Sequence, residues 1–123
     1  METIYKNDQL LQLTKWTYYI HDSSVSRFDI YLQDSQLYID VYFNSGDSRS
    51  KNGKVLKIHF TDIIRYQFLY SNNYQFYNVE SYKFFKSENG YYMSLDPFDE
   101  SEEISEEDED LILCENIEGC FLW

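Results

Sequence analysis

The chain has few residues that form disulfides or that restrict or relax the backbone: two Cys, one Pro and four Gly among 123 residues. Cys114 and Cys120 are too few for a disulfide framework, so we expect reduced, buried thiols. Their spacing is not that of a zinc or redox pair. A chain of this length can bury enough apolar surface to fold as one domain, residues 1–123, without a metal or disulfide.

Long apolar runs are missing as well. No segment approaches the ~20 residues that a membrane-spanning helix needs. The N-terminal residues METIYKNDQLLQL contain no basic region followed by an apolar one, so they do not resemble a signal peptide. We therefore expect a cytoplasmic protein that has no membrane partner.

Basic residues are missing from the last third of the chain. All ten Lys and Arg lie at or before Lys86, where they face nine acids, whereas residues 87–123 contain thirteen acids and no base. The net charge of -12 therefore belongs to one part of the molecule. Such a surface is unsuited to direct binding of nucleic acid and suits a basic protein partner.

Aromatic residues are abundant, with thirteen Tyr and nine Phe, and they favour strands. Apolar and polar residues alternate in 27–32, 37–43 and 55–60, which is typical of half-buried antiparallel strands. The sequence predicts a mainly β fold of about eight short strands, as an antiparallel sheet, sandwich or partly open barrel, with a short helix within 4–14 capped by Asn7 or Asp8. The other predicted strands are 16–22, 63–70, 74–79, 82–86, 91–95 and 111–114.

The connections carry turn signals. Residues 44–54 are polar, contain two Gly and no apolar residue, and are predicted to form a flexible hairpin tip. Thr61-Asp62 separates two patterned runs, which indicates a bulged strand or a tight connection. Asn89-Gly90 favours a turn with positive φ. Ser105 and Asp108 resemble a capping pair, which indicates a helical turn near 105–110.

The stretch Ser94–Asp110, SLDPFDESEEISEEDED, is densely acidic, and the apolar segment LILCENIEGCFLW follows it directly. An acidic run with a buried segment on either side is a loop anchored at both ends. An extended chain advances ~3.3 Å per residue, close to the ~3.4 Å between phosphates along one DNA strand. A protein that binds a polyanion could therefore bind this loop in its place. A solvated loop that aids solubility is an equally simple interpretation.

The residues that we expect to contact a partner lie within this loop. Phe98 and Ile104 are its apolar anchors, and its carboxylates would pair with Lys or Arg of the partner. The full set is Asp96, Phe98, Asp99, Glu102, Glu103, Ile104, Glu106, Glu107, Asp108 and Asp110.

Other chemistry has weaker signals. The acids of the loop do not have the EF-hand spacing, so a Ca²⁺ site would be irregular. His21 lies beside Asp22, and His59 lies three residues before Asp62, but no third partner marks a catalytic or metal site, and we read both as surface histidines. No nucleophile motif or phosphate loop is present. We expect no enzymatic activity and no cofactor.

The segments YYMSLDPFDE (91–100) and SEEDEDLI (105–112) resemble the end of small bacterial proteins, some of which are similar to immunity proteins of polymorphic or contact-dependent toxin systems. The resemblance implies an intracellular inhibitor of a toxin, in many cases a nuclease. The expected function is therefore neutralisation of a basic toxin domain through the acidic loop. The alternatives are a Ca²⁺- or small-molecule-binding β module and a nucleic-acid-mimic inhibitor of phage type.

Overall fold

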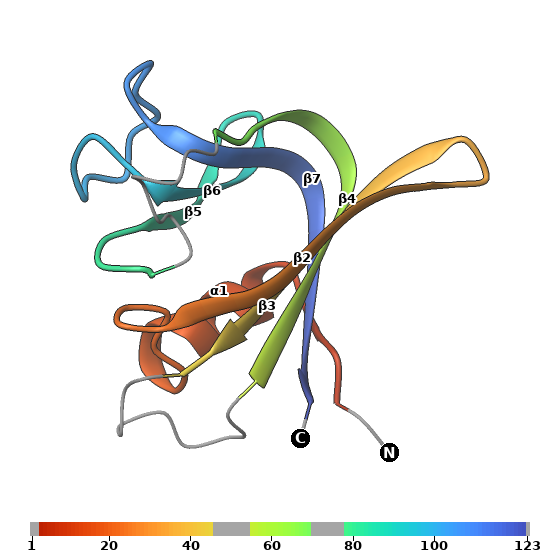
Figure 1. Ribbon diagram of the computed structural model, residues 1–123, viewed down its shortest axis with the longest axis horizontal. Coiled ribbons are helices and arrows are strands. Elements are labelled where there is room, and N and C mark those ends of the chain that lie inside the picture. Colours follow the sequence, from red (N-terminus) through yellow and green to blue (C-terminus); the bar gives the residue numbers. More distant parts are fainter. Residues whose placement is uncertain (1–2, 46–54, 70–77, 123) are drawn as a thin grey trace.

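The fold is a strongly curved antiparallel sheet with one helix on its inner side (Figure 1). A computed structural model describes residues 3–45, 55–69 and 78–122. Seven strands in these residues form one sheet that is not closed into a barrel, so the predicted mainly β fold with a short N-terminal helix is confirmed. The elements are β1 (Tyr5–Lys6), α1 (Asp8–Trp16), β2 (Ser24–Gln33), β3 (Gln36–Asn44), β4 (Val55–Gln67), β5 (Lys83–Ser87), β6 (Gly90–Asp96) and β7 (Glu109–Leu122).

The sheet is arranged around β7. The strand order is β2-β3-β4-β7-β6-β5, and β1 also pairs with β7. On one side, β4 follows β7 from the Val55–Leu122 pair to the Gln67–Leu111 pair. On the other side, β6 pairs with the first half of β7 and β1 with the second half. The strand that follows the acidic loop is therefore hydrogen-bonded to three other strands.

The first residues of β7 are covered on both faces, as their continuous apolar pattern predicts. Ile112 and Cys114 are buried in the main core, which also contains the inward residues of β3 and β4. Leu111 points to the opposite face and packs with Phe85 and Tyr92 in a second cluster. This double burial fixes the end of the acidic loop.

The helix α1 packs on the second half of β7. Leu10 and Leu13 are buried in the main core. A Cβ at Gly119 would lie 2.5 Å from Leu10 Cδ1, so a larger residue there would require the Leu10 side chain to move. Asn7 is the N-cap residue of α1, as one of the two predicted alternatives has it, but its side chain makes no capping hydrogen bond. Asn7 precedes α1, but its Oδ1 accepts a hydrogen bond from Ile117 N at 2.9 Å, which attaches the helix start to β7.

The predicted strand at 16–22 is also wrong. Residues 17–23 contain no strand, and Tyr18 and Ile20 are buried in the core from an irregular segment. The Tyr18 hydroxyl donates to Phe43 O at 3.0 Å. The alternate burial of its side chains gives this segment a strand-like sequence pattern, although the segment itself is not in a strand.

The patterned run at 55–60 and the first part of the run at 63–70 belong to one bulged strand, β4, which ends at Gln67. Asp62 adopts a φ of 53°, and the register with β7 shifts between Ile63 and Arg65. Asp62 Oδ2 accepts a 2.6 Å hydrogen bond from Asn116 Nδ2, which holds the bulge against β7. Gly90 has the positive φ expected for its turn, at 143°. Most of the predicted loop 44–54 and of the predicted strand 74–79 lies outside the described residues.

The hairpin of β2 and β3 extends beyond the rest of the sheet as an arm (Figure 1). The last pair between β3 and β4 is Ile39–Phe60, and Ile39 pairs with Ile30 on β2, so residues 31–38 form an arm of two strands. Asp34 and Ser35, both with positive φ, make the turn at its tip. Among the described residues, no helix is long and apolar enough to cross a membrane.

Candidate functional site

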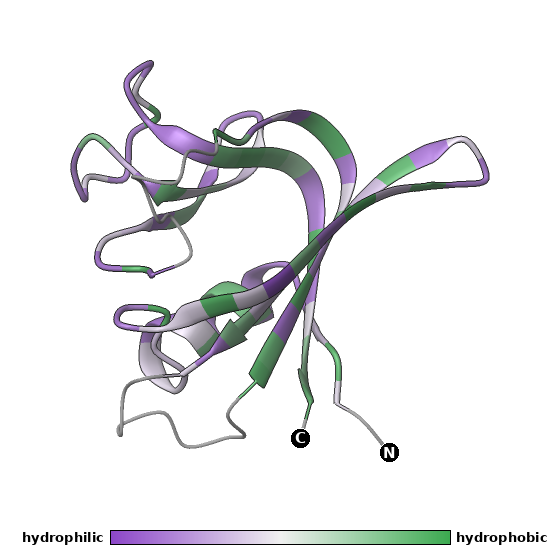
Figure 2. Cartoon of the chain, in the orientation of Figure 1, coloured by the Kyte–Doolittle hydropathy of each residue, from purple (hydrophilic) through white to green (hydrophobic). Residues whose placement is uncertain are grey.

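The acidic loop, residues 97–108, connects β6 to β7. Asp96 and Glu109 form the strand pair at its base, and the Ser94 hydroxyl donates to Glu109 O at 2.6 Å. Both ends of the loop are therefore held by the sheet. Figure 2 shows that the loops at this end of the molecule are hydrophilic and lie opposite the β2–β3 arm.

Asp108 organises the loop from within. Its side chain is buried, with the residue 2% exposed. Its carboxylate accepts hydrogen bonds from Phe98 N at 2.8 Å and Ser105 N at 3.0 Å. The Tyr92 hydroxyl donates to it at 2.7 Å. Burial alone would raise the pKa of Asp108, but these bonds and Lys83 outweigh burial, and the pKa lies below its usual value.

The turn predicted from Ser105 and Asp108 is present. The two residues exchange hydrogen bonds, from Ser105 N to the Asp108 carboxylate and from Asp108 N to Ser105 O at 3.1 Å. The chain makes one turn there and continues into β7, so no helix follows.

Lys83 supplies the counter-charge. It lies on β5 with a side chain that is 1% exposed, and its Nζ is 3.1 Å from the Asp108 carboxylate. The same Nζ donates to Glu103 O at 2.6 Å and lies 3.3 Å from Asp99 Oδ1. Among the described residues, Lys83 is the one Lys or Arg that forms ion pairs with this loop. Lys83 faces inward and pairs with Asp99 at the edge of the loop. The other exposed carboxylates of the loop form no ion pair with a Lys or Arg of the described residues.

The outer carboxylates form an exposed anionic surface, and two apolar side chains stand among them. Phe98 is 63% exposed and Ile104 is 42% exposed. Hollows of about 450 and 430 Å³ lie between the loop and β5, and Glu102 lines both of them. The exposed acids are Asp99, Glu100, Glu102, Glu103, Glu106 and Glu107.

Two of the residues predicted to contact a partner are in the interior. Asp108 and Asp110 are 2% and 1% exposed, so neither presents a carboxylate to a partner. Asp110 Oδ1 accepts a 2.9 Å hydrogen bond from Leu69 N and thereby joins β7 to the segment after β4. Both acids therefore hold the loop in place, while Asp96 is half-buried at its base.

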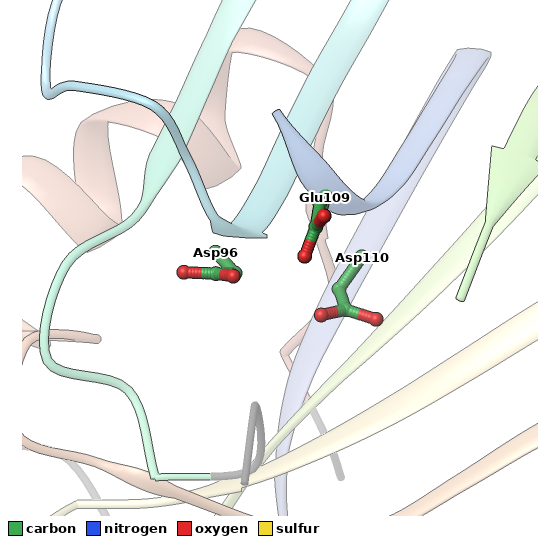
Figure 3. A group of neighbouring side chains, drawn as sticks. All are labelled: Asp96, Glu109 and Asp110. Carbon is green, nitrogen blue, oxygen red and sulfur yellow. The ribbon is translucent and has the colours of Figure 1, made fainter. Parts of the chain in front are cut away.

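Three carboxylates meet where the loop joins β7 (Figure 3). Oxygens of Asp96, Glu109 and Asp110 lie within 4.8 Å of one another. Burial raises the pKa of Glu109, and the neighbouring charges of Asp96 and Asp110 raise it further. A proton or a cation at this point relieves the repulsion, and carboxylate oxygens are ligands that Ca²⁺ prefers.

The sequence analysis missed two clusters. Lys83 could not be matched to Asp108 because twenty-five positions separate them. His59 pairs with Asp40 and not with Asp62: their side chains are 2.5 Å apart, and the two residues face each other across β3 and β4. The alternation in 37–43 and 55–60 could have found this pair if the two strands had been aligned by their apolar residues.

The Asp40 cluster lies on the opposite face of the sheet from the main core. The Tyr31 hydroxyl donates to Asp40 at 2.9 Å, and Tyr38 stacks on His59 at a centroid distance of 5.2 Å. Burial, followed by this hydrogen bond, raises the pKa of Tyr31 to about 12. A hollow of about 220 Å³ adjoins Tyr31 and His59. The carboxylate is fully engaged within the sheet, so the cluster connects three strands.

His21 is paired with Asp22 at 3.1 Å on the surface, as its sequence position suggests. Cys114 is buried, which raises the pKa of its thiol to about 12, and Cys120 is half-buried.

Comparisons of the chain with protein-family models, with curated proteins and with solved structures find no match.

Proposed function

We propose that this protein is a non-enzymatic inhibitor that binds a basic protein, in the manner of an immunity protein that occludes the cationic site of a toxin. The exposed acids of the loop would pair with Lys and Arg of the partner, and Phe98 and Ile104 would fill apolar depressions between them. Aromatic anchors surrounded by charges are typical of tight interfaces. Complementary charges accelerate association and fix the orientation of the partners.

One observation carries the proposal. The loop has a defined shape because Asp108 and Lys83 hold it from inside. Of its exposed carboxylates, Asp99 alone forms an ion pair with a Lys or Arg of the described residues. A loop that served only solubility would not need a buried ion pair, which is costly to desolvate. A fixed array of charges can bind without first being ordered, which reduces the entropic cost of association.

The test first identifies the product of the gene beside that of this chain and, where that product is a basic toxin, measures its association with this protein. Replacing Glu106 and Glu107 by Lys should slow association about tenfold or more at low salt, with a smaller effect on dissociation. Stopped-flow or surface-plasmon measurements at two salt concentrations give both rates. The matched control reverses two exposed acids away from the loop, Glu80 and Glu115, and has the same net charge.

If the two double variants bind equally well, the loop is not the binding surface and the proposal is wrong. If the neighbouring gene encodes no basic toxin and the chain inhibits a nucleic-acid enzyme of a phage or its host, the same surface serves as a nucleic-acid mimic.

The carboxylate cluster favours a second candidate, a Ca²⁺-binding β module. Asp96, Glu109 and Asp110 bring oxygen ligands together without a cation of the described chain among them. Titration calorimetry with Ca²⁺ should then show a saturable heat that is lost in Glu109→Gln and retained in Glu107→Gln. Absence of a saturable heat in the wild type removes this candidate.

A further inference from the structure

The outer strand of the β2–β3 arm exposes an apolar row. Phe28, Ile30 and Leu32 share one face of β2 and are 40%, 37% and 72% exposed. Phe28 rests on Phe68 with ring centroids 5.3 Å apart. Ile30 pairs with Ile39 at the base of the arm, and Leu32 pairs with Leu37 on the arm itself. Natural proteins commonly protect a long edge strand with charges, bulges or a covering segment, because an apolar edge pairs with another chain.

The edge of β2 is occupied at one end only, among the described residues. Asn78 forms a bridge with Ser24, and β3 pairs with the other side of the strand. β2 is the last strand in the order of the sheet. No strand of the described residues pairs with the outer edge of β2 at residues 27–33, so we take this part of the edge as the one that another chain can pair with.

We infer that two copies of this chain associate through β2, side by side and antiparallel, with Ile30 opposite Ile30 across a two-fold axis. In this register Phe28 of each copy faces Leu32 of the other, so the three exposed apolar side chains of each copy form one continuous row. On the second face, Asp29 lies opposite Tyr31 and Arg27 opposite Gln33. No like charges face each other, and the interface is self-complementary, as two-fold symmetry requires.

Neighbouring registers fit less well. Centring the pair on Asp29 sets two Asp29 carboxylates opposite each other, which is unfavourable. Centring it on Phe28 requires the edge at Ser24, where Asn78 already pairs. Leu32 lies on the two-stranded arm and Ile30 lies at its base. Within one chain, the acidic loop lies at the opposite end of the molecule from this arm (Figure 1). The association is therefore independent of the function proposed for the acidic loop.

The first test is the mass in solution. Light scattering over a dilution series should give twice the mass of one chain at high concentration and dissociation on dilution. Ile30→Lys should give a monomer at every concentration, because it sets two ammonium groups opposite each other in the middle of the row. Ile64→Lys, an equivalent change at an exposed isoleucine on β4, should leave the dimer intact. Circular dichroism confirms that both variants are folded.

The second test fixes the register by disulfide formation in a Cys120→Ser background. Opposite residues of an antiparallel pair have Cα atoms ~4.5–5.5 Å apart, within the range of a disulfide. Ile30→Cys should therefore cross-link rapidly on oxidation. Leu32→Cys should cross-link at least tenfold more slowly, since the two copies of residue 32 are four positions apart in this register, or ~13 Å. A monomeric wild type, a dimer that survives Ile30→Lys, or equal cross-linking of the two cysteine variants overturns the inference.

Discussion

At the scale of single residues, one buried lysine determines the shape of the most acidic part of the molecule. Lys83 contacts Asp108, Asp99 and Glu103 O, which lie at different points along the loop. Its position is set by the pair that β5 makes with β6, in which Lys83 faces Ser94. A substitution of Lys83 is therefore expected to alter the conformation of the whole loop.

We expect Lys83→Met to reduce the free energy of unfolding by about 3 kcal/mol, because it leaves the Asp108 carboxylate buried without a counter-charge. Urea denaturation followed by tyrosine and tryptophan fluorescence measures the change. Lys86→Met, on the exposed side of the same strand, is the control and should change the stability by less than about 0.5 kcal/mol. Similar losses in both variants would mean that the buried ion pair does not hold the loop.

Glu109 should give a pH effect of the opposite sign to that of Asp108. Its pKa in the folded protein is raised by burial and by Asp96 and Asp110, so the folded state holds this proton more tightly than the unfolded chain does. This group therefore favours folding below its usual pKa, and that contribution is lost as the pH rises through the raised value. Glu109→Gln should be more stable than wild type at pH 7, with a flatter pH dependence.

Melting temperatures between pH 4 and pH 8 test this expectation. Glu107→Gln removes the same charge from the exposed part of the loop and serves as the control. A Glu109→Gln variant that is no more stable than the Glu107→Gln variant at pH 7 contradicts the expected repulsion.

At the scale of elements, the turn between β5 and β6 determines how closely these strands approach β7. Gly90 has a φ of 143°, and a Cβ there would lie 2.3 Å from Cys114 O on β7. We expect Gly90→Ala to destabilise the protein by about 2 kcal/mol through backbone strain and this clash. Urea denaturation of Gly90→Ala and of its exposed neighbour variant Glu88→Ala provides the comparison. Equal stability of the two would show that the turn tolerates a side chain.

The sequence allowed the fold class and several strands to be predicted because alternation is a local property. The patterns in 27–32, 37–43 and 55–60 correspond to β2, β3 and the first part of β4. The same kind of pattern failed at 16–22, where the side chains enter the core from a segment without a strand partner. Whether a strand forms depends on a partner strand that can be distant in sequence. The periodicity of apolar residues does not identify that partner strand.

The candidate site was predictable in outline only. The run of acids and the apolar segment behind it identified an anchored loop, and most of its acids are exposed as expected. The separation of inner from outer acids was not predictable, because Asp108 and Asp110 are buried by contacts with Lys83 on β5 and Leu69 after β4. These contacts depend on tertiary structure, and nothing in the local sequence distinguishes Asp108 from Glu107.

At the scale of the whole molecule, the charge is concentrated at one end of a curved sheet. The net charge of -12 and the six exposed acids of the loop imply self-repulsion that salt screens. We expect the melting temperature at pH 7 to rise by about 4 °C between low and moderate NaCl concentrations, equivalent to roughly 1 kcal/mol. Scanning calorimetry measures this shift. A fall in melting temperature would show that attractive ion pairs outweigh the repulsion.

The central position of β7 has a consequence for how the protein is made. Its partners β1, β4 and β6 all precede it in the chain, so a ribosome synthesises them before the strand that joins them. Until Leu122 has left the exit tunnel, the nascent chain has neither a complete sheet nor a second anchor for residues 97–108. The acidic loop therefore acquires its fixed shape only after β7 has been synthesised.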